Sequence, residues 1–188
     1  MRSGLFVSLA EWAAKRVSML PEDNERAWKA NILVPVRSSR ELRGSFSLIQ
    51  NLVYPRGSVS LIGISDTEED DLTESLINFS SSFLRENTYA RWSFIKSNNF
   101  QDAVLYSIQT LRGSFFSPNI LFLRLLHDET YDEEISNIMA NARMNNMGIQ
   151  LYIEDTVAQL GRTASINVWM RDKGPDWDLD MDLGNIDL

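Results

Sequence analysis

Ile120-Leu121-Phe122-Leu123 is the stretch that decides the fold of this chain, and Ile32-Leu33-Val34 has the same character nearer its start. Both runs are short and apolar at every position, which favours strands over helices. A strand that is apolar at every position must be covered on both faces, as in parallel sheets that lie between layers of helices. The two runs therefore predict central strands of a buried parallel sheet.

Outward from these runs, short β-rich segments alternate with longer helical patterns. Strands are expected over residues 32–36, 59–64, 91–96, 120–126 and 149–153, and helices over 40–53, 71–86, 99–112 and 132–144. This alternation predicts βαβ units, because parallel neighbours need a crossover about one helix long. The expected fold class is α/β, a doubly wound five-stranded parallel sheet. Right-handed crossovers on each side of the first strand give the strand order 3-2-1-4-5.

The two ends of the chain differ from this body. Leu5, Leu9 and Trp12 recur at helical spacing within residues 3–18, and Pro21 follows them, so the sequence predicts an amphipathic N-terminal helix. Arg2, Lys15 and Arg16 against Glu11 give this end a net charge of +2, which would favour an anionic membrane surface. We expect the chain to be a fragment, and the expected division is a linker helix over 1–20, a connector over 21–31, the α/β domain over 32–164 and the acidic start of a second α/β half over 165–188, opened by a strand at 165–170.

Composition narrows the function classes. The 188 residues hold 18 Lys and Arg against 26 Asp and Glu, which gives a formal net charge of −8 and a pI of about 4.7. Nucleic-acid binding needs clustered cations to displace phosphate counterions, so DNA and RNA are unexpected partners. The absence of cysteine excludes disulfides and thiolate metal sites and fits a reducing compartment. No apolar run reaches the roughly 18 to 20 residues that cross a bilayer.

Catalytic and cofactor motifs are also missing from the sequence. His127, the one histidine, follows the fourth predicted strand, but Asp128 is only its neighbour in sequence and no Gly-x-Ser-x-Gly elbow accompanies it. Neither the G-x-G-x-x-G turn of dinucleotide-binding folds nor the G-x-x-x-x-G-K-[ST] phosphate loop occurs in the sequence. The sequence therefore predicts no catalytic residue, no cofactor site and no metal site.

Three weaker patterns have ordinary structural explanations. Arg37-Ser38-Ser39-Arg40 could hold an anion, but more often such a segment is a helix start with a serine cap. Asp176-x-Asp178-x-Asp180 resembles a calcium loop, yet Met181 stands where that loop needs glycine, which favours an acidic strand or solvated loop. The acidic run over 66–71 suits the N-terminus of a helix. The five tryptophans are expected to be packing aromatics: Trp12, Trp28, Trp92, Trp169 and Trp177.

Several segments together resemble the cytosolic tail of cation-chloride cotransporters, which carry Na, K and Cl, or K and Cl, across membranes. The matching segments are Trp28-Lys29-Ala30-Asn31-Ile32-Leu33-Val34, Phe100-Gln101-Asp102-Ala103, Ser117-Pro118-Asn119-Ile120-Leu121, Ile166-Asn167-Val168-Trp169 and Gly184-Asn185-Ile186-Asp187-Leu188. Each motif alone is common, and their joint order and spacing carry the resemblance. The sequence lacks a long serine- and threonine-rich insertion, which favours a compact prokaryotic member.

This resemblance implies a non-catalytic regulatory and assembly domain on the cytoplasmic face of the membrane. The complete cytosolic tail would consist of two α/β halves, each similar to universal stress proteins. The implied partners are the protein's own membrane transport domain and a second copy of the chain, with no nucleic acid and no small molecule bound by this domain. The binding residues stay unknown, and the ions would be handled in the membrane part.

Three alternatives remain open at this stage. A nucleotide-binding universal stress protein would show the same alternation, but its glycine-rich phosphate loop would fall at residues 127–134, which are acidic and contain no glycine. Binding of ATP is therefore not expected. The chain could also be the tail of an amino-acid permease, or part of an enzyme whose site lies beyond Leu188.

Overall fold

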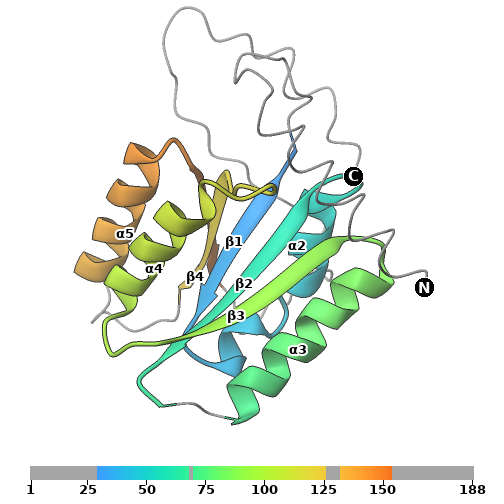
Figure 1. Cartoon of the computed structure of the whole chain (residues 1–188), viewed down its shortest axis with the longest axis horizontal. Helices are drawn as coiled ribbons and strands as arrows, with labels where there is room; N and C mark the ends of the chain where they lie inside the picture. Colours follow the sequence, from blue (N-terminus) through green and yellow to red (C-terminus); the bar gives the residue numbers. More distant parts are fainter. Residues whose placement is uncertain (1–28, 68–69, 126–131, 154–188) are drawn as a thin grey trace, which may run out of the picture. The chain divides into compact units, whose positions relative to one another are not determined.

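A computed structural model describes residues 29–67, 70–125 and 132–153 of the chain, and these residues form a parallel sheet with helices on both faces (Figure 1). All neighbouring strands are parallel, and the strand order is β3-β2-β1-β4-β5. The predicted fold class and strand order are confirmed. The strands are β1 (Asn31–Val36), β2 (Ser58–Ser65), β3 (Tyr89–Lys96), β4 (Ile120–Leu125) and β5 (Gly148–Ile153).

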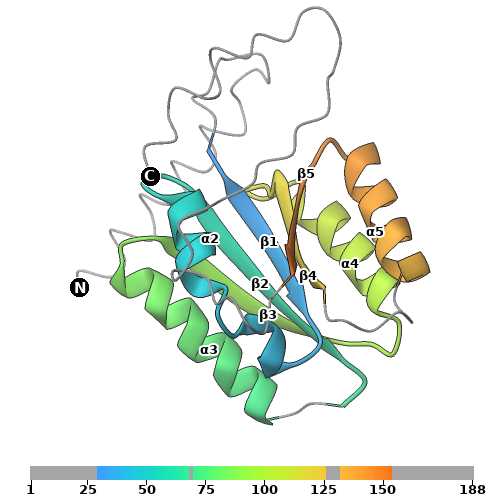
Figure 2. The same ribbon diagram turned by 180° about the vertical axis from the view of Figure 1, so that it is seen from behind.

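The helices are divided between the two faces, as a doubly wound sheet requires (Figures 1 and 2). One face carries the 3-10 helix η1 (Ser39–Leu42), α2 (Phe46–Val53) and α3 (Asp70–Arg85). The other face carries α4 (Phe100–Leu111) and α5 (Asp132–Met144). The central strands are therefore shielded from water on both sides.

Strand β1 shows how the sequence builds two hydrophobic cores at once. Ile32, Val34 and Val36 pack into the core beneath α2 and α3, while Leu33 packs into the core beneath α4 and α5. All four side chains are buried. Complete burial of one such side chain contributes about 1.5–3 kcal/mol relative to exposure, so continuous apolar strands favour this sandwiched position.

The helix predicted over residues 40–53 is wrong in one respect, because two helices occupy that stretch. Between η1 and α2, Gly44 adopts a left-handed backbone with φ of 73°, a conformation that glycine tolerates and that ends a helix. Buried Ser45 then donates its Oγ proton to the Leu42 carbonyl at 2.8 Å. The other predicted helices and strands lie within two residues of those observed. The predicted N-terminal helix and the strand at 165–170 lie outside the described residues.

Candidate functional site

In open α/β sheets, ligands bind outside the carboxyl ends of the strands where the strand order reverses. Here that switch point lies between β1 and β4, which pair with each other and continue the sheet in opposite directions. Arg37 directly follows β1, so its side chain decides what the switch point can hold. The predicted candidate His127 follows β4 but lies outside the described residues.

Arg37 connects the end of β1 to both helices of the adjacent layer. Its Nη2 donates to Glu134 Oε2 on α5 in a half-buried ion pair. Its guanidinium carbon also lies 3.7 Å from the centroid of the Phe100 ring at the start of α4. Ion pairing and cation–π contact both stabilise this position, so protein contacts hold the guanidinium over the switch point.

Glu41 supplies a buried carboxylate behind Arg37. Its Oε2 accepts a hydrogen bond from the Arg37 backbone N–H at 3.2 Å, and the side chain is buried. Burial raises the pKa of Glu41 above its ordinary value, and the Arg37 hydrogen bond and the charges of Arg37 and Arg124 oppose that rise only in part. The Glu41 carboxyl is therefore a buried group beside the switch point whose protonation depends on pH.

Arg124 on β4 holds the η1 turn in place. Its Nη1 donates to the carbonyl oxygens of Arg40 and Arg43 at 2.6 Å and 2.5 Å. Its guanidinium carbon also lies 5.6 Å from the centroid of the Tyr152 ring on β5. The cation is used for backbone and ring contacts that position a turn.

The anion cradle considered for Arg37-Ser38-Ser39-Arg40 does not assemble. Arg37 pairs with Glu134, and Ser39 Oγ donates to Asp71 Oδ2 at 2.5 Å. The serine-cap interpretation is also wrong in detail, since Ser38 occupies the N-cap of η1 without a side-chain capping hydrogen bond. Ser39 is bonded to the first turn of α3 instead, through Asp71.

A cleft of about 240 Å³ remains beside the switch point, at the ends of β1, β2 and β3. It is lined by Arg37, Ile64, Ser65, Asp66, Ser97, Asn98 and Phe100. The lining contains no glycine turn, and Asp66 would repel phosphate while Arg37 is already neutralised by Glu134. The cleft is poorly suited to a nucleotide.

The acidic patterns also give no metal site in the described ranges. Asp70 and Asp71 lie in the first turn of α3, where negative charge is stabilised by the helix dipole, as expected. In residues 29–67, 70–125 and 132–153, no group of three potential ligands could hold a metal ion. The calcium-like pattern at Asp176 lies outside them.

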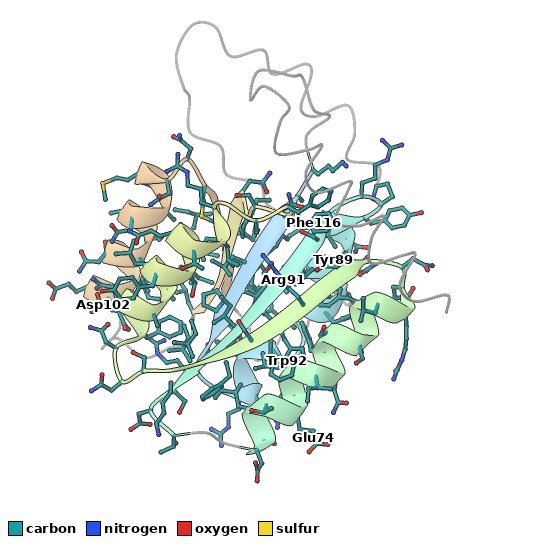
Figure 3. The ribbon with its side chains drawn as sticks, in the orientation of Figure 1. Glu74, Tyr89, Arg91, Trp92, Asp102 and Phe116 are labelled. Atoms are coloured by element: carbon teal, nitrogen blue, oxygen red, sulfur yellow. The ribbon has the colours of Figure 1, made fainter. Side chains whose placement is uncertain are left out.

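Sequence reasoning missed an exposed aromatic surface beside β3. Trp92 was predicted to be a packing aromatic, but it is 40% exposed because β3 is an edge strand; the other four tryptophans lie outside the described residues. Figure 3 shows Tyr89, Arg91 and Phe116 gathered at the amino end of this strand. The ring centroids of Tyr89 and Phe116 are 4.5 Å apart. Arg91 and Lys96, two cations within a predicted strand, were the available signal of an edge.

Two of the five segments behind the family resemblance, those that contain Asn31 and Asn119, meet at the amino end of the sheet. Asn119 Oδ1 accepts from the Asn31 N–H at 2.8 Å, and Asn119 Nδ2 donates to the Lys29 carbonyl at 2.7 Å. Asn31 in turn donates from Nδ2 to the Ser117 carbonyl and accepts from Ser58 Oγ. These side chains join β1, β2 and the segment before β4, so these two motifs have a structural role.

Comparison with known proteins places this chain beside one family of membrane transporters. The family model for the first C-terminal domain of prokaryotic cation-chloride cotransporters matches residues 34–160, and the model for the second such domain matches residues 161–188. No protein in the curated collection matches. None of the described helices is long and apolar enough to cross a membrane.

A solved structure titled as the cytoplasmic domain of a prokaryotic cation chloride cotransporter is 39% identical to this chain, with a TM-score of 0.63. The match covers 71% of this chain and 49% of that one, so the chain spans about half the length of its solved relative. Because the first-domain model matches well over half of the residues, the chain belongs to the C-terminal domain family of prokaryotic cation-chloride cotransporters.

Proposed function

We propose that this chain is a non-catalytic regulatory and assembly domain that lies on the cytoplasmic face of the membrane, attached to the transport domain of its own protein. The observation that carries the proposal is the match of both C-terminal domain families in their order along the chain. The intact protein would couple movement of Na or K to Cl by secondary active transport. The ions would pass through the membrane part and not through this domain.

The closed switch point supports a role without catalysis. Arg37, Glu134 and Phe100 occupy the position where related α/β folds bind ligands, and Glu41 behind them is buried. Within the described residues, this arrangement offers no nucleophile beside a base and no phosphate-binding turn. It disfavours both the enzyme and the nucleotide-binding alternatives.

We further propose that the domain helps two copies of the transporter associate. Two-fold pairing is the commonest arrangement of identical chains. A net charge of −8 per chain opposes association in free solution, so we expect a weak self-interaction that the membrane strengthens by raising the effective concentration.

The test uses the full-length protein reconstituted in liposomes, with and without the tail. We expect chloride-dependent cation uptake and the cross-linked dimer fraction both to fall when the tail is deleted. A matched control deletes only residues 1–28 of this chain and keeps the transport domain and the rest of the tail. Unchanged uptake and unchanged dimer fraction in the tail-less transporter would refute the role in regulation and assembly.

The division into residues 1–20, 21–31, 32–164 and 165–188 stays a prediction, and limited proteolysis tests it. Cleavage is expected first within 21–31 and near residue 164, because linkers between folded units are the preferred sites of nicking. Cleavage first within 32–153 would contradict the division.

A further inference from the structure

Strand β3 presents an open backbone edge. It pairs with β2 over eight consecutive residues, and the Ser97 N–H continues this ladder by donating to the Ser65 carbonyl at 2.9 Å. Because the backbone groups of successive strand residues point to opposite sides, those of Ala90, Trp92, Phe94 and Lys96 point away from β2. The Thr88 N–H follows the same alternation, since it donates to the Phe83 carbonyl and not to β2.

Within the described residues, charge is the one device that protects this edge against pairing. Proteins blunt edge strands with charged side chains, proline, bulges, short length or a covering segment, and of these β3 carries the cations Arg91 and Lys96. Strand β3 has eight residues, no proline and an uninterrupted register with β2. In the part of the chain that the structure describes, no strand pairs with its outer side. The edge is therefore geometrically able to accept another strand.

Apolar side chains flank the edge on the α3 side. Helix α3 turns one side to η1 and α2, through the Ser39–Asp71 hydrogen bond and the contact of Phe79 with Phe46. Ile77 and Leu84 lie on its opposite side, toward the β3 edge, and are 41% and 52% exposed. Trp92 lies on this same face of the sheet, beside α3 (Figure 3).

The other face of the edge carries an aromatic cluster and a fixed cation. Phe115, which is 56% exposed, packs against Phe116 with ring centroids 4.7 Å apart, and Phe116 packs against Tyr89. Arg91 donates from Nε to Ser60 Oγ at 2.9 Å and from Nη2 to Ser114 Oγ at 3.1 Å. These hydroxyls orient the guanidinium without neutralising its charge.

The charge of the edge selects among possible occupants. Residues 87–101 contain Arg91 and Lys96 and no acidic residue, although the chain as a whole carries −8. A second copy paired through β3 would bring like charges together, which is unfavourable. An acidic segment would meet the opposite charge and could still bury apolar side chains against Trp92 and Tyr89.

We propose that the β3 edge binds an extended acidic peptide segment of a partner protein, which adds to the sheet as a sixth strand. Main-chain hydrogen bonds to Ala90, Trp92, Phe94 and Lys96 provide the affinity. The cations Arg91 and Lys96 and the apolar side chains on each face provide the selectivity. Neither the transport function nor the state of the switch point enters into this inference.

The experiment measures residue-resolved amide exchange in the 188-residue chain with three synthetic peptides. The probe is a capped decapeptide of alternating valine and glutamate; one control replaces each glutamate by lysine, and the other replaces two valines of the acidic peptide by proline. With the probe at ten times its Kd, exchange at Trp92, Phe94 and Lys96 should slow about tenfold. Ser93 and Ile95, which face β2, should not change.

Two charge reversals test the electrostatic part. Lys96→Glu should weaken binding of the acidic peptide about fivefold, the upper range for an exposed ion pair. The matched control Lys29→Glu should leave binding unchanged. The proposal is overturned if no peptide slows these amides, if the lysine peptide protects them equally, or if they become protected with rising protein concentration alone, which would make a second copy the occupant.

Discussion

Asn31 and Asn119 lie 88 positions apart in the sequence, yet the backbone N–H of Asn31 donates to the side-chain Oδ1 of Asn119 at 2.8 Å. The Asn119 N–H also donates to the Asn31 carbonyl at 2.9 Å, so the two residues bind each other through backbone and side chain. This contact fixes the start of β1 against the segment that enters β4. Two of the motifs that identify the family therefore act as one structural unit.

Asn119→Ala should destabilise the domain by about 1–3 kcal/mol, because it leaves the part-buried Asn31 N–H and the Lys29 carbonyl without their side-chain partners. Urea unfolding at neutral pH measures the change. The matched control is Asn51→Ala at an exposed position of α2, expected within about 0.5 kcal/mol of the unsubstituted chain. Equal unfolding midpoints for both variants would contradict a stabilising role of the Asn31–Asn119 contact.

Gly57→Ala should destabilise the domain by about 1–3 kcal/mol or more, because the added Cβ has no room. It would overlap the Ala30 carbonyl oxygen and lie 2.7 Å from the Val53 carbonyl oxygen, and backbone atoms cannot move aside cheaply. Gly113→Ala is the control, since a Cβ there meets nothing within 4 Å. Thermal unfolding of both variants decides the comparison, and a Gly57→Ala protein as stable as the control would show that the turn before β2 can relax.

The sheet could be predicted because the sequence patterns that specify it are short and recur along the chain. Apolar runs mark β1 and β4, turn residues precede β2, β4 and β5, and the crossover rules then leave few strand orders. The break at Gly44 was missed because a single glycine inside a helical pattern is often tolerated. Its left-handed φ depends on how η1 packs, which the helical periodicity does not encode.

The site-level contacts could not be predicted, because they join distant residues. Arg37 and Glu134 are 97 positions apart, and no sequence pattern links the two. The exposure of Trp92 follows from the position of β3 at the sheet edge, which the predicted order implied, but side-chain exposure also depends on how far α3 reaches over that edge. Only the assembled layers determine these contacts.

Glu41 should make the stability of the domain fall as pH rises above the ordinary glutamate pKa of 4.5. Its folded-state pKa is raised, chiefly by burial, so the folded chain holds a proton that the unfolded chain has lost. The loss begins near pH 4.5 and is complete above the folded-state pKa. Glu41→Gln should remove this contribution.

The measurement is the unfolding free energy of Glu41→Gln relative to the unsubstituted chain between pH 4.5 and 7. The difference should move in favour of the glutamine variant as pH rises. Glu74→Gln, at an exposed position of α3, serves as the control for the loss of one surface carboxylate. A difference that moves against Glu41→Gln with rising pH would mean that the Arg37 and Arg124 interactions outweigh burial.

Arg37 and Glu134 should show a coupling energy of about 0.5–1 kcal/mol in a double-mutant cycle, as expected for a half-buried ion pair. Arg37→Ala alone should cost more than Glu134→Ala, because it also removes the contact with the Phe100 ring, worth about 0.5–1 kcal/mol. Denaturant unfolding of the four proteins gives both values. A coupling near zero would indicate that solvent screens the pair.

ATP should not raise the melting temperature of the domain by more than about 1 °C at millimolar concentration, because stabilisation requires a binding site in the folded state. The switch point is closed by Arg37 and Glu134, and Asp66 lines the neighbouring cleft. Glu134→Ala is the informative variant, since it releases the Arg37 guanidinium and removes a negative charge from this end of the sheet. If ATP raises the melting temperature of that variant but not of the unsubstituted chain, the ion pair itself excludes the nucleotide. If ATP raises neither melting temperature, the missing glycine turn is enough to explain why ATP does not bind. A shift of several degrees in the unsubstituted chain would contradict the closed site and restore the nucleotide-binding alternative.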